Sequence, residues 1–158
     1  MVMTRDLQHV VLVDTKRGDK ISRGFTGGTV ELNELDIDAC VREVHEEIGI
    51  DLSGQQLLLV GGYNKRAART YGVWPESKDE PLQINDHFSV FVAFAPLDVQ
   101  FKRQESEIET VAWYRVEGIL SGTVEGVHRS NVDILRAFID NPASSMECRR
   151  VKDDKVVF

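Results

Sequence analysis

Cysteine is scarce in this 158-residue chain, and long apolar runs are missing from it. The two cysteines, Cys40 and Cys148, form neither a metal-binding motif nor a disulfide framework. No apolar run approaches the roughly 20 residues that cross a bilayer, and the first residues contain no apolar signal-peptide stretch. We therefore expect a cytoplasmic protein without a membrane partner, in which Cys40 packs in the core.

Positively charged residues are also fewer than negatively charged ones. The chain has 19 Lys and Arg against 26 Asp and Glu, which gives a formal net charge of −7. This balance argues against a broad electrostatic contact with long nucleic acid. It leaves room for a nucleotide or a capped RNA end, because a bound metal and a few local bases can hold phosphates. The four histidines have no metal-ligand spacing.

Strand and helix signals alternate along the chain without a repeat or a linker, so we expect one α+β domain over residues 1–158. The patterns predict strands at residues 8–15, 21–25, 57–63, 87–95 and 111–116, and helices at residues 36–48 and 130–140. In the last strand Trp113 and Tyr114 should lie on opposite faces. Ser130 is the expected N-cap of the second helix. The tail, residues 146–158, is either an added edge strand or a frayed end.

Residues 28–50 form the most informative segment. Apolar residues recur there at spacings of 4, 3 and 4 along one side of the predicted helix, at Ile37, Val41, Val44 and Ile48. Such a stripe is typical of a helix that lies on a core. Gly49 follows the stripe, at the position where helices most often end in a left-handed conformation.

Three carboxylates occupy another face of the same helix. Because a helix turns about 100° per residue, Glu47 lies about 40° from Glu43, and Glu46 lies about 60° the other way. Like charges this close repel each other by a few tenths of a kcal/mol. A divalent cation held against a phosphate explains their proximity, since hard oxygen ligands suit Mg²⁺, Mn²⁺ or Ca²⁺. The alternative is a solvated acidic face.

The same segment resembles the Nudix box, the signature of the Nudix hydrolase family. The box reads Gly, five residues, Glu, seven residues, then Arg-Glu-aliphatic-any-Glu-Glu-any-Gly-aliphatic. Its nine fixed positions are met by Gly28, Glu34, Arg42, Glu43, Val44, Glu46, Glu47, Gly49 and Ile50. The resemblance implies the Nudix fold, a mixed β-sheet sandwiched between helices, and a metal-dependent hydrolase.

The resemblance also implies a metal site. Glu46 and Glu47 resemble the principal ligands, and the backbone carbonyl of Gly27 resembles a further one. Glu43 resembles a residue that either binds a second metal or takes a proton from the attacking water, so it is a metal and a catalytic candidate. The implied cofactor is Mg²⁺, with Mn²⁺ as a substitute.

Other box positions resemble structural residues. Arg42 resembles the residue that pairs with acids of the box, and we expect Glu34 to be its partner, with Gly28 as the third structural position. One departure stands out before the box. The family usually has Phe-Pro-Gly-Gly, whereas this chain has threonine at position 26. Threonine lacks the fixed φ of proline, so the loop is expected to be looser.

A further acid is expected from another loop, where Glu105, Glu107 and Glu109 are the candidates. In the family this ligand or base commonly stands some six residues before a tryptophan-bearing strand. Here that tryptophan is Trp113, which selects Glu107 as the second catalytic candidate. A solvated loop carboxylate is the alternative.

Substrate contacts are predicted from the densest basic stretch, residues 64–71, and the aromatic residues near it. Guanidinium groups can hold phosphates, and aromatic rings can stack on a base. The predicted substrate-binding residues are Arg23, Arg66, Arg69, Tyr71 and Trp74. The alternative is a solvated loop after a strand.

The favoured substrate is a small molecule with a diphosphate, most commonly a nucleoside triphosphate, a nucleotide sugar or a dinucleotide. Removal of a cap or 5′ diphosphate from RNA is a rival activity. Isomerisation of a prenyl diphosphate needs a catalytic cysteine that Cys40 and Cys148 do not supply. A binding module without catalysis would usually have lost box acids, and this chain has lost none. A homodimer is left open.

Overall fold

Strand β2 (His9–Arg17) is buried on both of its faces. Successive side chains of a strand point to opposite faces of a sheet. Val11 and Val13 belong to one hydrophobic cluster, and Val10 and Leu12 belong to another. The valine-rich run therefore forms a central strand with a core on each side.

The computed structural model describes residues 1–17, 20–68, 83–151 and 155–157. Its other strands are β1 (Val2–Met3), β3 (Lys20–Gly24), β4 (Leu57–Ala68), β5 (Gln83–Phe94), β6 (Ile108–Arg115), β7 (Met146–Val151) and β8 (Lys155–Val157). They form a sheet in the order β3-β2-β1-β5-β4-β7-β8, and β6 also pairs with β2. The β1–β5 pair is parallel and the other described pairs are antiparallel, so the sheet is mixed.

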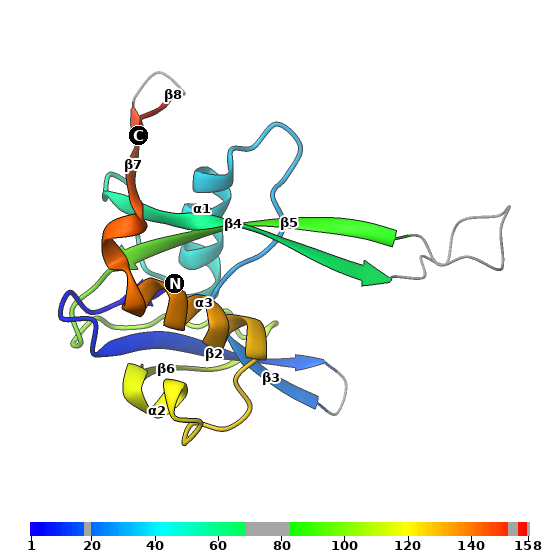
Figure 1. Ribbon diagram of the computed structural model, residues 1–158, viewed down its shortest axis with the longest axis vertical. Coiled ribbons are helices and arrows are strands. Elements are labelled where there is room, and N and C mark those ends of the chain that lie inside the picture. The colour runs from blue at the N-terminus through cyan, green and yellow to red at the C-terminus, as the bar shows by residue number, and fades with distance from the viewer. Residues whose placement is uncertain (18–19, 69–82, 152–154, 158) are drawn as a thin grey trace, which may run out of the picture.

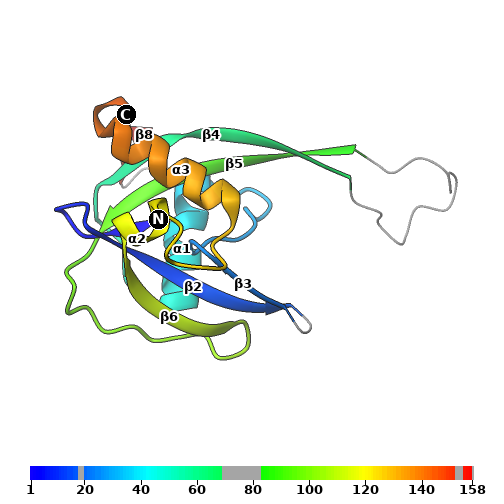
Figure 2. The ribbon, with the colours of Figure 1, turned by 60° about the horizontal axis from the view of Figure 1, so that its bottom comes forward.

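Helices cover both faces of this sheet (Figures 1 and 2). They are α1 (Asp36–Ile48), α2 (Val116–Leu120) and α3 (Arg129–Asp140), followed by a 3₁₀ turn (Pro142–Ser144). Val44 and Ile48 of α1 pack in the cluster that contains Val11, and Leu135 and Phe138 of α3 pack in the other cluster. The predicted α+β arrangement, a mixed sheet between helices, is confirmed. None of the helices in the described part of the chain is long and apolar enough to cross a membrane.

Several local predictions are confirmed. Helix α1 has the predicted bounds, and Gly49 ends it with a φ of 73° while its N–H donates to the carbonyl of His45 over 2.9 Å. Trp113 packs in the cluster that contains the α1 residues (the α1-side cluster), and Tyr114 packs in the cluster that contains the α3 residues (the α3-side cluster). The two side chains therefore lie on opposite faces of β6. Cys40 packs against the α1-side core, and burial raises the pKa of its thiol. Of the two alternatives for the tail, added strands are present, since β7 pairs with β4 and β8 pairs with β7 at the edge of the sheet.

The predicted N-cap of α3 is wrong. The helix begins at Arg129, its N-cap is His128, and Ser130 lies within the first turn. The N–H of His128 donates to the carbonyl of Arg23 over 3.0 Å, which holds His128 in an extended conformation beside β3. The hydroxyl of Ser130 lies 2.8 Å from Nδ1 of His128. A contact with a distant strand therefore decides where this helix starts.

Candidate active site

The loop between β3 and α1 is tied to the helix by Arg42. Nε of Arg42 donates to Oε1 of Glu34 over 2.9 Å, and Nη2 donates to Oε2 of Glu34 over 3.0 Å. Nη2 also donates to the carbonyl of Thr29 over 3.1 Å. The predicted pair of Arg42 and Glu34 is therefore present, in the bidentate geometry that makes arginine–carboxylate hydrogen bonds strong and directional. It fixes the loop against the middle of α1.

The remaining arm of the guanidinium contacts two further acids. Nη1 donates to Oε1 of Glu43 over 2.8 Å and to Oε2 of Glu46 over 3.2 Å. With the contacts to Glu34 and Thr29, the five N–H groups of Arg42 make five hydrogen bonds. Glu34 first, and then Glu43, raise the pKa of Arg42 above its usual value. Three carboxylates therefore share one positive charge.

Glu43 lies between Arg42 and the backbone of Gly28. A Cβ atom built on Gly28 would overlap the Glu43 carboxylate. The Glu43 side chain is only 17% exposed in this position. Glycine at position 28 thus has a steric reason, because any side chain there would displace the acid from its place beside the arginine.

Glu47 lies in the most buried place of the three helix carboxylates and is 6% exposed. Its Oε2 accepts a hydrogen bond of 3.0 Å from the N–H of Gly27. Burial raises the pKa of Glu47 to about 7, the Gly27 hydrogen bond opposes this, and the negative charges of Glu43, Glu107 and Glu46 add to it. The loop glycine and the helix acid are therefore neighbours, as the predicted metal site requires.

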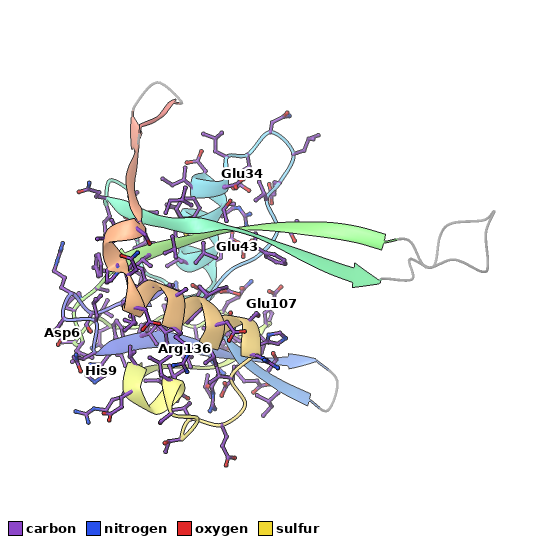
Figure 3. The ribbon with its side chains drawn as sticks, in the orientation of Figure 1. Asp6, His9, Glu34, Glu43, Glu107 and Arg136 are labelled. Carbon is purple, nitrogen blue, oxygen red and sulfur yellow. The ribbon has the colours of Figure 1, made fainter. Side chains whose placement is uncertain are left out.

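Glu107 comes from another loop and is exposed. Its charge is one of those that raise the pKa of Glu47, which places it near the buried acid. The loop is held to the end of α1 by the main chain, because the N–H of Gln104 donates to the carbonyl of Glu47 over 3.1 Å and Glu107 donates to the carbonyl of Gln104 over 3.3 Å. Figure 3 shows Glu107 and Glu43 on the same side of the molecule, away from Asp6 and His9. The catalytic role of Glu107 stays a prediction.

The donor chemistry of this site fits a divalent cation. Glu43, Glu46, Glu47 and the carbonyl of Gly27 offer hard oxygen atoms, and Gly28 leaves the space in which Glu43 sits. Within the described residues, no three acidic, histidine or cysteine side chains yet converge as a metal site does. Glu43 and Glu46 each accept a hydrogen bond from Arg42, and Glu47 accepts one from the Gly27 N–H.

The guanidinium of Arg23, a predicted phosphate contact, is engaged within the protein. Nε and Nη2 donate to the carboxylate of Asp14 over 2.7 and 2.9 Å, and Nη1 donates to the carbonyl of Glu125 over 3.0 Å. The guanidinium carbon lies 5.0 Å from the centre of the Tyr114 ring, and the Thr110 hydroxyl donates to Asp14 over 2.7 Å. These contacts give Arg23 a structural role that joins β2, β3 and β6. Its contact with a phosphate stays a prediction.

Strands β4 and β5 project together from the body of the molecule (Figures 1 and 2). Arg66, another predicted substrate residue, lies in β4, opposite Asn85 of β5. Arg69, Tyr71 and Trp74 lie outside the described residues. Their predicted substrate contacts stay predictions.

Sequence reasoning missed two features of the structure. The first is the network around Asp14, for which a charged residue at the end of the buried run 10–14 was an available signal, since buried charges require partners. The second concerns Thr26, where the family usually has proline. Its hydroxyl oxygen is buried without a hydrogen-bond partner among the described residues. Spacing alone gives no sign of that burial.

The NUDIX domain family model matches residues 1–137, which include β1 to β6, α1, α2 and most of α3. The chain belongs to this family. The family and the fold that the sequence resemblance implied are therefore confirmed. Nudix hydrolases generally use divalent metal ions, and the reaction class of this Nudix chain is that of a pyrophosphohydrolase.

Solved structures with the same fold are distant in sequence. The dihydroneopterin triphosphate pyrophosphohydrolase of E. coli is 20% identical with a TM-score of 0.64, over 89% of this Nudix chain and 91% of its own. The MutT NUDIX hydrolase of Burkholderia pseudomallei is 18% identical with a TM-score of 0.60, over 86% and 92%. An Ap4A hydrolase of C. elegans is 16% identical with a TM-score of 0.57, over 90% and 93%. At such identities the likeness shows the fold alone. No curated protein sequence is significantly similar to the chain.

Proposed function

We propose that this Nudix chain hydrolyses the diphosphate linkage of a nucleoside diphosphate joined to another moiety, with Mg²⁺ as the cofactor and Mn²⁺ as a substitute. The substrate class comprises nucleoside triphosphates, nucleotide sugars and dinucleotides. One observation carries the proposal. Helix α1 presents Glu47 to the N–H of Gly27 and Glu43 to Gly28, while Arg42 bonds Glu43 and Glu46 and, through Glu34, ties the glycine loop to the helix.

The cation, when bound, neutralises the diphosphate and stabilises the charge that develops on its oxygens. Glu46, Glu47, Glu43 and the Gly27 carbonyl would hold it. Water attacks a phosphorus atom, the bond from that phosphorus to its bridging oxygen breaks, and the attacking water loses a proton to a carboxylate. Glu43 and Glu107 are the two candidates for this base. Glu107 is exposed and beside Glu47, so a water molecule can reach it.

The similar structures support a small nucleotide-like substrate. Two of them are a dihydroneopterin triphosphate pyrophosphohydrolase and an Ap4A hydrolase. The net charge of −7 supports the same choice over long nucleic acid. We also propose that residues 1–158 act as one domain. All the residues of the site come from one chain, so the proposal needs no second copy.

A substrate panel tests the proposal. The full chain is incubated with nucleoside triphosphates, nucleotide sugars, dinucleoside polyphosphates and capped RNA, each with Mg²⁺ or Mn²⁺, and release of phosphate, pyrophosphate and nucleotide is measured. Glu46→Gln serves as the inactive control, and Glu105→Gln, on the Glu107 loop, serves as the matched active control. Hydrolysis of small nucleotides that Glu46→Gln lacks supports the proposal. Hydrolysis of capped RNA alone would favour decapping, and binding without hydrolysis would favour a non-catalytic module.

A further inference from the structure

Asp14 is a buried acid of β2 that lies outside the set of box residues. Its Oδ1 accepts a hydrogen bond from Nε of Arg23 over 2.7 Å, and its Oδ2 accepts one from Nη2 of Arg23 over 2.9 Å. The Thr110 hydroxyl also donates to Oδ2, over 2.7 Å. Arg23 belongs to the end of β3 and Thr110 to the start of β6. One carboxylate therefore joins these two strand ends.

Both partners of Asp14 stand close in sequence to residues of the candidate site. Gly27 follows Arg23 by four residues, and Glu107 precedes Thr110 by three. Chain segments of these lengths span at most about 14 Å and about 11 Å. A displacement of Arg23 or Thr110 is therefore passed on to the glycine loop or to the exposed acid through few backbone torsions.

A β-bulge lies at the start of β6. Asp14 pairs with Thr110 and the next residue of β2 pairs with Ile108, so Glu109 is an extra residue in β6. In a regular strand Ile108 and Thr110 would face the same side of the sheet. Thr110 instead contacts Asp14, which shares the face of Leu12 in the α3-side cluster, whereas Ile108 is buried in the α1-side cluster. The bulge therefore turns the start of β6, directly after the exposed loop acid, toward α1, as bulges beside active sites commonly do.

We propose that Asp14 is a positioning residue of the active site, which fixes Gly27 and Glu107 relative to each other because it holds Arg23 and Thr110 at once. This inference rests on the proposed function, since it concerns the same reaction. In this role Asp14 acts through its two partners. Its loss should therefore lower kcat more than it changes KM, because the rate of a chemical step falls steeply when catalytic groups are displaced.

Thr110→Val tests the connection to Glu107. Thr110 is exposed, so this substitution removes one hydrogen bond without opening the core. With the best substrate of the panel, we expect kcat to fall about fivefold and KM to change less than about twofold. Thr110→Ser keeps the hydroxyl and should keep kcat within about twofold of the unaltered value. The matched control is Thr15→Val, which removes a hydroxyl that donates to the carbonyl of Ser22 over 3.3 Å and should leave kcat unchanged.

A double-mutant cycle separates positioning from a general loss of structure. In the Glu107→Gln background, Thr110→Val should lower kcat by less than about twofold, since the group that it positions is already gone. Asp14→Asn weakens both connections, so we expect kcat to fall about tenfold or more. It should lower kcat in the Glu107→Gln background as well, because the connection to Gly27 is also weakened.

Backbone amide signals in NMR spectra of the full chain without a cation give a readout besides activity. Thr110→Val should shift the signals of Glu107 and Ile108 and leave that of Gly27 in place, whereas Asp14→Asn should shift all three. If Asp14→Asn does not fold, Thr110→Val decides.

Three results would overturn the inference. They are an unchanged kcat in Thr110→Val or in Glu107→Gln, a loss of kcat in Thr110→Val that is equally large with and without Glu107, and an amide signal of Glu107 that stays in place in Thr110→Val. Absence of hydrolysis by the unaltered chain would instead remove the function proposed above, and the amide signals would then still decide whether Asp14 holds both loops.

Discussion

Replacing Glu47 by glutamine should stabilise the cation-free protein at neutral and alkaline pH. Glu47 is 6% exposed, and its pKa is raised to about 7 from 4.5. Each pKa unit corresponds to about 1.4 kcal/mol, so keeping this carboxylate ionised costs the folded state up to about 3 kcal/mol. A glutamine carbonyl can still accept the Gly27 N–H without that cost. Because its amide group must also be buried, we expect a net gain of about 2 kcal/mol at pH 8.

The pH dependence has a defined sign. Below pH 4.5 Glu47 is protonated in both the folded and the unfolded state, so the variant gains nothing. Between pH 4.5 and about 7 the unfolded chain loses the proton and the folded chain keeps it, so the stability of the unaltered protein falls as pH rises. Above pH 7 both states are ionised and the difference is constant.

Urea unfolding in EDTA between pH 4.5 and pH 8 measures this difference, and thermal unfolding should show a gain of about 4–8 °C at pH 8. The matched control is Glu46→Gln, because Glu46 is 49% exposed and in water its charge costs little. A stability difference for Glu47→Gln that stays constant over this pH range would refute the burial argument.

Three further outcomes are expected. Glu46→Gln should nearly abolish hydrolysis of the best substrate and leave the fold intact, because an amide is a poorer ligand for a hard cation; steady-state kinetics and circular dichroism check this. Glu107→Gln should lower kcat substantially with little change in KM, while Glu105→Gln matters much less; equal, mild effects would mean that the loop contributes only diffuse charge. Asp14→Asn should destabilise the protein by about 2 kcal/mol in urea at pH 7. Because Arg23 first, and Thr110 as well, lower the pKa of Asp14, this difference should disappear as pH falls below about 3.8.

The pattern of residues within an element was sufficient to predict that element where its own residues decide its structure. Helix α1 has its predicted bounds because an apolar stripe and Gly49 define it without help from elsewhere. The two-residue strand β1 was not predictable, since it exists through its pairing with β2 and β5. The start of α3 was misjudged for the same reason, because the carbonyl of Arg23 holds His128.

The candidate site also has features that the sequence predicted and features that it could not predict. The box spacing put Glu43, Glu46 and Glu47 on neighbouring positions of one helix face, and it suggested the partner of Arg42. Spacing could not say that Arg42 would also reach Glu43 and Glu46. It could not say that Glu47 would be buried while Glu46 stayed exposed, because burial depends on which loops cover the helix.

The attachment of the Glu107 loop to α1 has a consequence for how the sequence can change. Lys102 and Gln104 donate backbone N–H groups to the carbonyls of Ile48 and Glu47 over 2.9 and 3.1 Å. Every residue except proline can make these bonds, so other substitutions at the two positions keep the attachment of the loop to α1. A residue inserted or deleted between Gln104 and Glu107 would move the exposed acid relative to the buried one. The spacing of the two acids is thus protected against exchange of residues and sensitive to a change in their number.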